Sequence, residues 1–182
     1  MINSQYPITK TKFYAESCSP FRLEGGRGEG FWATLLDKSG IAYEIKTYPV
    51  DETDLSAVHV AEQLGEDPGV IFKTLVLRGD KTGIFVAIIP GNEEANRKKA
   101  AKISGNKSAE MIPLKELLPL TGYIRGGCSP IGMKKKYPVY LHESCLLFEK
   151  IYVSAGQRGL QVKLNPSDLA GYLDAKICSL VG

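Results

Sequence analysis

The sequence contains few of the side chains from which proteins usually build hydrolytic or metal sites. Its 182 residues include two histidines, His59 and His142, and four cysteines without a C-x-x-C pair. Neither histidine lies at metal-ligand spacing from another histidine or from a cysteine pair, so we predict no metal site. The sequence has no local signature, such as a nucleophile elbow, that would support a catalytic serine triad. G-x-x-x-x-G-K-[ST] and G-x-G-x-x-G motifs are missing, so we expect no cofactor.

Long apolar runs and strong charge are also absent. No uninterrupted apolar stretch approaches the roughly 20 residues of a membrane-spanning helix, and the N-terminus lacks a signal-peptide pattern. We therefore expect a soluble, cytoplasmic protein without a membrane partner. The scattered cysteines, Cys18, Cys128, Cys145 and Cys178, are expected to be reduced thiols. The net charge of +3 means that any polyanion must be bound by local clusters of Lys and Arg.

The length and composition indicate one domain that begins after a leader. Residues 1–30 have no apolar period and end in the glycine-rich stretch 24–30, which is typical of a linker. We interpret them as a tail or added leader outside the fold. Residues 31–182 are long enough to bury a single core, and we predict that they form one domain.

Short helices and short strands alternate along this domain. Helical patterns cover 31–38, 56–64 and 114–118, and strand patterns cover 41–45, 70–78, 84–89, 139–141, 151–154 and 160–164. The first strand is expected to be half-buried, and residues 79–83 are expected to close a hairpin. We predict a mixed α/β fold, in which a curled mixed β-sheet or barrel is surrounded by short helices.

Two further helices have sequence signals at their starts. Asn92 is expected to cap a helix that carries Glu93 and Glu94 in its first turn and ends near residue 104. Asn165, followed by Pro166, is expected to cap the last helix, because proline is favoured at the first helical position.

Three segments could carry chemistry, although each also has a plain structural explanation. Lys73 lies inside an apolar strand, where it either reaches solvent or serves a site. The glycine-rich residues 121–132 can bring backbone amides close to an oxyanion or phosphate, or form an ordinary loop. Residues 152–160 join a strand to a glycine-flanked arginine, as a hairpin turn also would. The residues alone do not decide among these readings.

Taken together and in this order, the segments resemble the YbaK/EbsC family of aminoacyl-tRNA deacylases, which is related to the editing domain of bacterial prolyl-tRNA synthetase. The resemblance covers about residues 31–180. The matching segments are residues 47–48, 72–75, 121–123, 126–132 and 151–156. The sequence of residues 126–132, together with the lysines at 134–136, is most similar to that of the cysteine-specific branch of the family.

The resemblance implies roles for individual residues. Lys73 is the residue most needed for activity, and Gly126 and Gly127 complete the catalytic set. The expected substrate-binding residues are Tyr48, Thr74, Cys128, Ser129, Ser154 and Gln161. Two positions depart from the family pattern. Gln161 replaces a typical acid, and a family aromatic expected shortly after Tyr48 has no clear match.

The resemblance also implies a substrate-assisted reaction on Cys-tRNA(Pro). The thiol of the tRNA-bound cysteine attacks its own ester carbonyl, while the protein orients the substrate and stabilises charge through Lys73 and glycine amides. Cys128 is then a bystander. Binding differences of about 1–3 kcal/mol cannot exclude a similar-sized amino acid from a synthetase pocket, which is why a second, editing site is needed.

Positive side chains are candidates for contact with the acceptor end of the tRNA. They are Arg97, Lys98, Lys102, Arg125, Lys134, Lys135 and Arg158. Each cluster alone is more often a solvated face. Docking to prolyl-tRNA synthetase is expected to supply tRNA selectivity. Two alternatives stay open: a deacylase for Ala-tRNA(Pro) that uses water, and a non-catalytic tRNA-binding or regulatory module.

Overall fold

The computed structural model describes residues 31–182, so the predicted leader 1–30 lies outside the described residues. Within that range the α-helices are α1 Phe31–Ser39, α2 Ala57–Leu64, α3 Arg97–Ile103, α4 Leu114–Thr121 and α5 Pro166–Leu173. The strands are β1 Tyr43–Thr47, β2 Phe72–Gly79, β3 Gly83–Pro90, β4 Ala109–Met111, β5 Val139–His142, β6 Ile151–Ser154, β7 Leu160–Leu164 and β8 Lys176–Cys178. None of these helices is long and apolar enough to cross a membrane.

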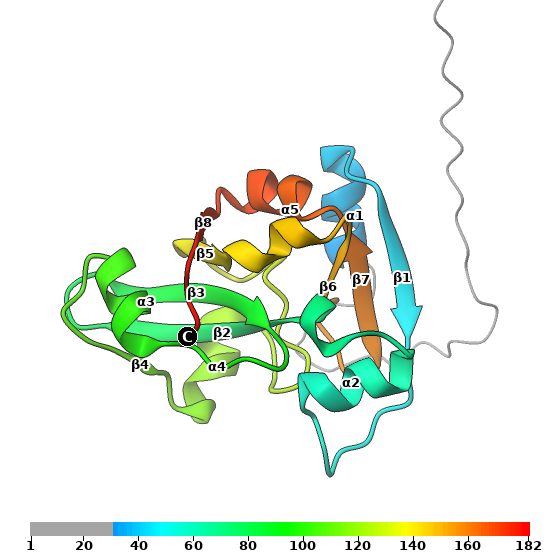
Figure 1. Cartoon of the computed structure of the whole chain (residues 1–182), viewed down its shortest axis with the longest axis horizontal. Coiled ribbons are helices and arrows are strands. Elements are labelled where there is room, and N and C mark those ends of the chain that lie inside the picture. Colours follow the sequence, from blue (N-terminus) through cyan, green and yellow to red (C-terminus); the bar gives the residue numbers. More distant parts are fainter. Residues whose placement is uncertain (1–30) are drawn as a thin grey trace, which may run out of the picture.

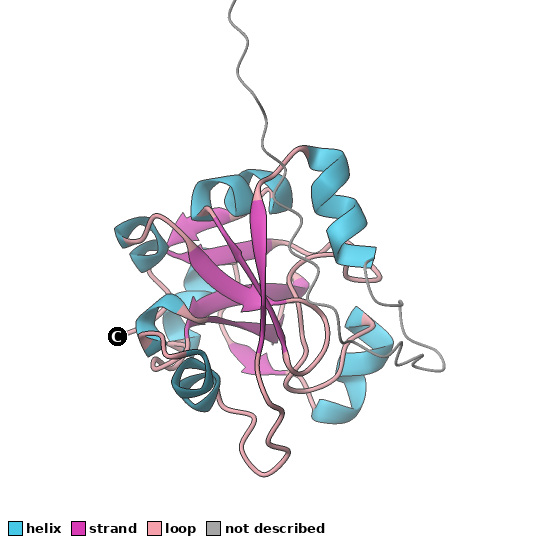
Figure 2. Cartoon of the chain, turned by 90° about the vertical axis from the view of Figure 1, so that its right-hand side faces the viewer, coloured by secondary structure: helices cyan, strands magenta, loops and turns pink. Residues whose placement is uncertain are grey.

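The strands form two sheets around which the helices are arranged (Figure 1). One sheet has the order β1-β7-β6 and is antiparallel. The other has the order β4-β2-β3-β5-β8, in which β5 is parallel to both of its neighbours. A single bridge between Ile71 and Tyr152 links the start of β2 to β6. The predicted mixed α/β fold is confirmed, with two linked sheets in place of one barrel (Figure 2).

Strand β3 is buried on both faces, which explains its continuous apolar sequence. Val86 and Ile88 belong to the larger core, which β6 and β7 complete, whereas Phe85, Ala87 and Ile89 belong to a smaller core under α3. β3 pairs with β2 along its whole length, from Phe72 opposite Pro90 to Gly79 opposite Gly83. This hairpin, which the sequence predicted, therefore connects the two cores.

Helix ends follow the sequence signals at three places. The Ser56 side chain accepts a hydrogen bond from the amide of His59 at the start of α2, and Gly65 ends the helix with φ of 67°. Asn165 accepts from the amides of Ser167 and Asp168 at the start of α5. These side chains satisfy backbone groups that the first helical turn leaves without partners.

Two local predictions are wrong. The helix expected after Asn92 begins at Arg97, because Asn96 caps it by accepting from the Lys99 amide at 3.1 Å. Residue Ala95 instead bridges to Val181, which keeps Glu93 and Glu94 outside the helix. The first strand exists, but Ile45 on it is 43% exposed, because β1 lies at the edge of its sheet. Strands β4 and β8, of three residues each, were not predicted.

Candidate functional site

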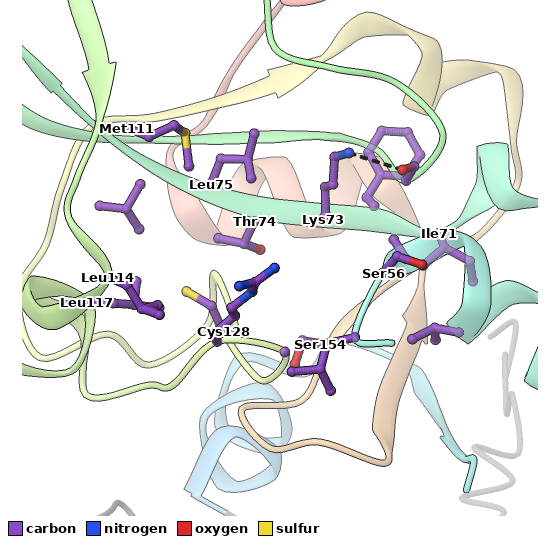
Figure 3. Close-up of a pocket in the computed structure, with 18 of the residues that line it drawn as sticks. Ser56, Ile71, Lys73, Thr74, Leu75, Met111, Leu114, Leu117, Cys128 and Ser154 are labelled. Atoms are coloured by element: carbon purple, nitrogen blue, oxygen red, sulfur yellow. Dashed lines mark hydrogen bonds between the residues drawn. The ribbon is translucent and has the colours of Figure 1, made fainter. Parts of the chain in front are cut away.

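A pocket of about 460 Å³ opens beside the first half of β2. The other walls come from the start of α2, from β4 and α4, from the loop before Ser129, and from β6 and β7 (Figure 3). Segments far apart in the sequence therefore meet there, among them the three segments singled out in the sequence. Seven of the predicted site residues line the pocket: Lys73, Thr74, Arg125, Gly126, Cys128, Ser154 and Gln161.

Lys73 is held at the polar end of the pocket. Its Nζ donates to the Gly91 carbonyl at 3.1 Å. Burial lowers the pKa of the Lys73 ammonium, while the charges of Glu94 and Glu93 act in the opposite direction. Gly91 has to be glycine at this point, since a Cβ there would lie 2.7 Å from the Cβ of Ala57. The backbone turn at Gly91 thus gives the lysine a carbonyl partner inside a partly desolvated site.

Successive residues of β2 point in opposite directions, as they must in a strand. In Figure 3, Lys73 and Leu75 lie on one side of β2 and Thr74 points to the other side, toward Cys128 and Ser154. The Thr74 hydroxyl oxygen is buried and has no hydrogen-bond partner within residues 31–182.

Gln161 contributes a second unpartnered oxygen. Its Oε1 is buried without a partner among the described residues, and the residue as a whole is 5% exposed. Gln161 is paired across the sheet with Ser154, so both side chains are on the same face. Buried oxygens are normally hydrogen-bonded, and two exceptions lining one pocket mark it as a place for a ligand with donor groups.

Gly126 and Gly127 have different structural roles. Gly126 lines the pocket with φ of 83°, and a Cβ on it would meet Leu55 at 3.2 Å and Arg158 Nε at 3.3 Å. The Gly127 amide instead donates to the Ile124 carbonyl at 3.1 Å, and Gly127 packs against the backbone of Gln157. Because this turn already uses the Gly127 amide, the predicted oxyanion donor is reduced to Gly126.

Cys128 lines the pocket with an inert thiol. Burial raises the pKa of Cys128 to about 12, despite a hydrogen bond with Thr121 that acts in the lowering direction. The thiol therefore stays protonated near neutral pH, whereas a nucleophilic cysteine requires a thiolate. This environment fits the prediction that Cys128 is a bystander.

Two predicted substrate-binding residues lie outside the pocket lining. The Ser129 side chain is fully buried, and its Oγ accepts from the Ile131 amide at 3.1 Å, which stabilises the loop. Tyr48 follows β1, and its amide donates to the Gly159 carbonyl at 3.0 Å. Both residues shape the loops around the site without reaching its interior.

The predicted tRNA-binding cations separate into two groups. Arg125 lines the pocket, and Arg158 donates to the Arg125 carbonyl at 3.0 Å while pairing with Glu52 at 3.1 Å. Lys134 and Lys135 are exposed on the segment after the glycine loop. The cations of α3, Arg97, Lys98 and Lys102, lie beside the far end of the hairpin from α2 (Figure 1), and Arg97 pairs with Glu110. The structure thus brings Arg125 and Arg158 to the pocket, whereas neither Lys134 and Lys135 nor the cations of α3 line it.

Sequence reasoning missed several residues of the wall. They are Leu55, Ser56, Gly91, Met111, Ile112, Leu114 and Leu117. The apolar ones have no signal in the sequence, because Met111 and Leu114 lie among other apolar residues; in the structure they are 47% and 60% exposed.

Comparisons with known proteins agree on one family. The sequence profile of the aminoacyl-tRNA editing domain matches residues 52–172. An Enterococcus faecalis protein named "Putative Cys-tRNA(Pro)/Cys-tRNA(Cys) deacylase EbsC" is 48% identical over 146 residues, which cover 80% of this chain and 89% of that protein. A proline–tRNA ligase of Shouchella clausii is 33% identical over 99 residues, 54% of this chain and 17% of the ligase.

A solved structure shows the same fold. It is described as the crystal structure of "a putative trans-editing enzyme for prolyl tRNA synthetase". The two structures superpose with a TM-score of 0.73 at 24% identity, covering 82% of this chain and 93% of the other.

Proposed function

The chain belongs to the aminoacyl-tRNA editing domain family, and from that premise we propose that it is a trans-acting deacylase that removes cysteine from Cys-tRNA(Pro). The reaction is hydrolysis of the ester between the amino acid and the terminal ribose of the tRNA. The preference for cysteine rests on the 48% identical relative whose name carries that substrate.

The composition of the pocket wall carries the proposal of a substrate-assisted mechanism. Among the residues from 31 to 182 that line the pocket, none is a histidine, aspartate or glutamate. The remaining thiol, that of Cys128, is kept protonated by its raised pKa. Ester hydrolysis by a protein nucleophile requires a base to activate it, and Lys73 is the one ionisable amine among the described wall residues that could serve as one. In this proposal Lys73 instead acts as an ammonium, and the substrate supplies the nucleophile.

A cysteinyl ester carries such a nucleophile. Its sulfur forms a bond to the ester carbonyl carbon, the C–O bond to the ribose breaks, and the thiol proton passes to the released ribose hydroxyl. Water then opens the resulting four-membered thiolactone to free cysteine. The pocket has to hold the cysteinyl group in the reactive conformation, which can account for much of a rate enhancement.

Lys73 has the task of stabilising negative charge on the carbonyl oxygen. Its ammonium is partly desolvated, and an electrostatic interaction is stronger where water is excluded. Gly126, with its amide not engaged in the turn that uses Gly127, is the backbone donor of the proposal. Thr74 and Gln161 offer acceptor oxygens to donor groups of the substrate.

The decisive experiment compares Cys-tRNA(Pro) with Ala-tRNA(Pro) and Ser-tRNA(Pro), using wild type, Lys73→Ala and Cys128→Ala. Rapid loss of cysteine alone, abolished in Lys73→Ala and retained in Cys128→Ala, is the expected result. Preferential release of alanine would replace this proposal by a water-dependent alanine deacylase. Failure to release any of the three amino acids would leave a binding module.

We further propose prolyl-tRNA synthetase as a partner that supplies tRNA selectivity. The matched region makes up 17% of a proline–tRNA ligase, so the same type of domain functions within a chain that binds this tRNA. Adding the synthetase should lower the KM for Cys-tRNA(Pro) more than that for cysteine on another tRNA. An equal effect on both tRNAs would contradict the partnership.

A further inference from the structure

Arg158 joins two loops at the rim of the pocket. Its Nε donates to the Arg125 carbonyl at 3.0 Å, and its Nη1 donates to Oε1 of Glu52 at 3.1 Å. Arg125 and the adjacent Gly126 line the pocket, and a Cβ on Gly126 would lie 3.3 Å from the Arg158 Nε. One nitrogen of the guanidinium is thus fixed beside the pocket by a carbonyl, and another is occupied by a carboxylate.

Glu52 lies at the tip of a turn, where its side chain can move without the backbone. The loop between β1 and α2 projects from the body of the molecule (Figure 1), and within it the amide of Asp54 donates to the Asp51 carbonyl at 3.3 Å. The carboxylates of Asp51 and Asp54 each accept a hydrogen bond from the amide two residues further along the chain, at 2.9 and 2.8 Å. These two acids hold the loop in shape, whereas the Glu52 side chain is 79% exposed and pairs with Arg158.

The ion pair between Glu52 and Arg158 is weakly held, and a phosphate is a stronger partner for the arginine. An exposed ion pair contributes little to stability, because water solvates both charges almost as well when they are apart. A guanidinium binds a phosphate through two parallel N–H bonds, and the Arg158 side chain, at 28% exposure, is accessible to one. The Glu52 carboxylate repels the same phosphate. The two anions therefore compete for one cation.

We infer that Glu52 competes with the tRNA backbone: it occupies Arg158 in the free protein, and a phosphate of the incoming aminoacyl-tRNA has to displace it. This inference rests on the proposed function, which places the end of the tRNA at the pocket that Arg125 lines. The exchange uses part of the binding energy, so tRNA binds less tightly than the cations of the rim alone would allow. The same cost applies to other RNA and to the deacylated product, so Glu52 favours release of tRNA over its retention.

Equilibrium binding of deacylated tRNA(Pro) to the full chain tests the inference without any reaction. Glu52→Gln should tighten binding about two- to fivefold at low salt, because the amide neither forms an ion pair with Arg158 nor repels the phosphate. Glu62→Gln is the matched control, since it removes a carboxylate that is 68% exposed and faces His59 at 3.6 Å. Unchanged or weaker binding by Glu52→Gln, or equal tightening by Glu62→Gln, would overturn the inference.

A double-mutant cycle tests whether Glu52 acts through Arg158. Arg158→Gln should weaken binding of deacylated tRNA(Pro) and reduce the dependence of log K on log salt by about one unit, because one phosphate contact is lost. Adding Glu52→Gln to Arg158→Gln should give less than half of the gain that it gives beside the arginine. A full gain in that background would mean that Glu52 repels tRNA directly, and it would overturn the inference.

Deacylation kinetics separate this inference from the proposed function. In Glu52→Gln the KM for Cys-tRNA(Pro) should fall by a similar factor of about two to five, with a kcat that is equal or lower because tRNA leaves more slowly. A lower Tm with no gain in tRNA affinity would make the pair a structural contact only and refute the inference. If wild type deacylates none of the esters, the proposed function fails, and the binding cycle still judges the role of Glu52.

Discussion

The two halves of strand β2 have different neighbours. From Leu77 to Gly79 the strand is paired on both sides, with β3 and with β4. From Phe72 to Leu75 it pairs with β3 only, and the pocket occupies the other side, between β4 and the Ile71–Tyr152 bridge. The candidate site thus lies where β2 is still paired with β3 but is no longer paired with β4. One half of β2 is thus paired within the sheet, and the other half lines the pocket.

The paired half should be sensitive to loss of packing. Leu77 is fully buried in the smaller core, and Leu77→Ala should lower the free energy of unfolding by about 2–5 kcal/mol. The protein that stays folded should keep its kcat/KM, because Leu77 does not line the pocket. Urea unfolding and deacylation assays provide the two measurements. Leu147→Ala, at an 81% exposed residue, is the control and should change stability by less than about 0.5 kcal/mol.

In the half of β2 that lines the pocket, a substitution should lower activity and leave stability unchanged or higher. Thr74→Val removes a buried hydroxyl that has no hydrogen-bond partner among residues 31–182, so stability should stay equal or rise by up to about 1 kcal/mol. Deacylation should fall about tenfold, because a group that binds substrate is lost. A drop in stability comparable with that of Leu77→Ala would remove the proposed contrast between the two halves.

The pH dependence sharpens the contrast at Lys73. Because burial lowers its pKa below the ordinary 10.5, activity that needs the ammonium should fall at a lower pH than for an exposed lysine. Between the lowered pKa and 10.5 the unfolded chain binds more protons, so the contribution of Lys73 to stability should increase with pH there.

Removing the two nearby acids tests this assignment. Glu93→Gln with Glu94→Gln eliminates charges that raise the pKa of Lys73, so the alkaline limb of kcat/KM should move to still lower pH. Glu149→Gln, on the exposed surface, is the control and should leave the limb in place. An alkaline limb that does not move in the double variant would belong to another group.

The smallest effect is expected at Cys128. Cys128→Ala should change kcat/KM by less than about twofold, because a thiol with a pKa of about 12 is not a nucleophile near pH 7. A much larger loss, with the Tm unchanged, would assign the thiol a direct part in the reaction.

Local signals in the sequence were enough to predict most of the fold. The helix cap at Asn165, the helical pattern that begins at Ser56 and the alternating apolar strands depend on near neighbours in the chain. The cap at Asn92 was wrong because two asparagines compete within five residues, and pairing of Ala95 with the distant Val181 favours the second. Long-range contacts of this kind leave no local pattern.

Several residues that the sequence singled out in motifs line the pocket, whereas no motif identified the apolar residues of its wall. Lys73, Thr74 and Ser154 lie in the segments that the sequence singled out. Leu114 and Leu117 resemble ordinary core residues of an amphipathic helix until the structure shows them beside the pocket. The hydrogen bond that occupies the Gly127 amide depends on the fold of the loop, which composition does not specify.

The unreactive thiol beside the site also has a consequence for product formation. The proposed thiolactone is an acylating agent, and a thiolate is the form of cysteine that it would acylate. If Cys128 were ionised, its sulfur would attack the carbonyl carbon of the proposed thiolactone and take the aminoacyl group as a thioester, while the ring sulfur leaves as the cysteine thiol. In the proposed mechanism, the raised pKa of Cys128 keeps this thiol from being acylated by the intermediate.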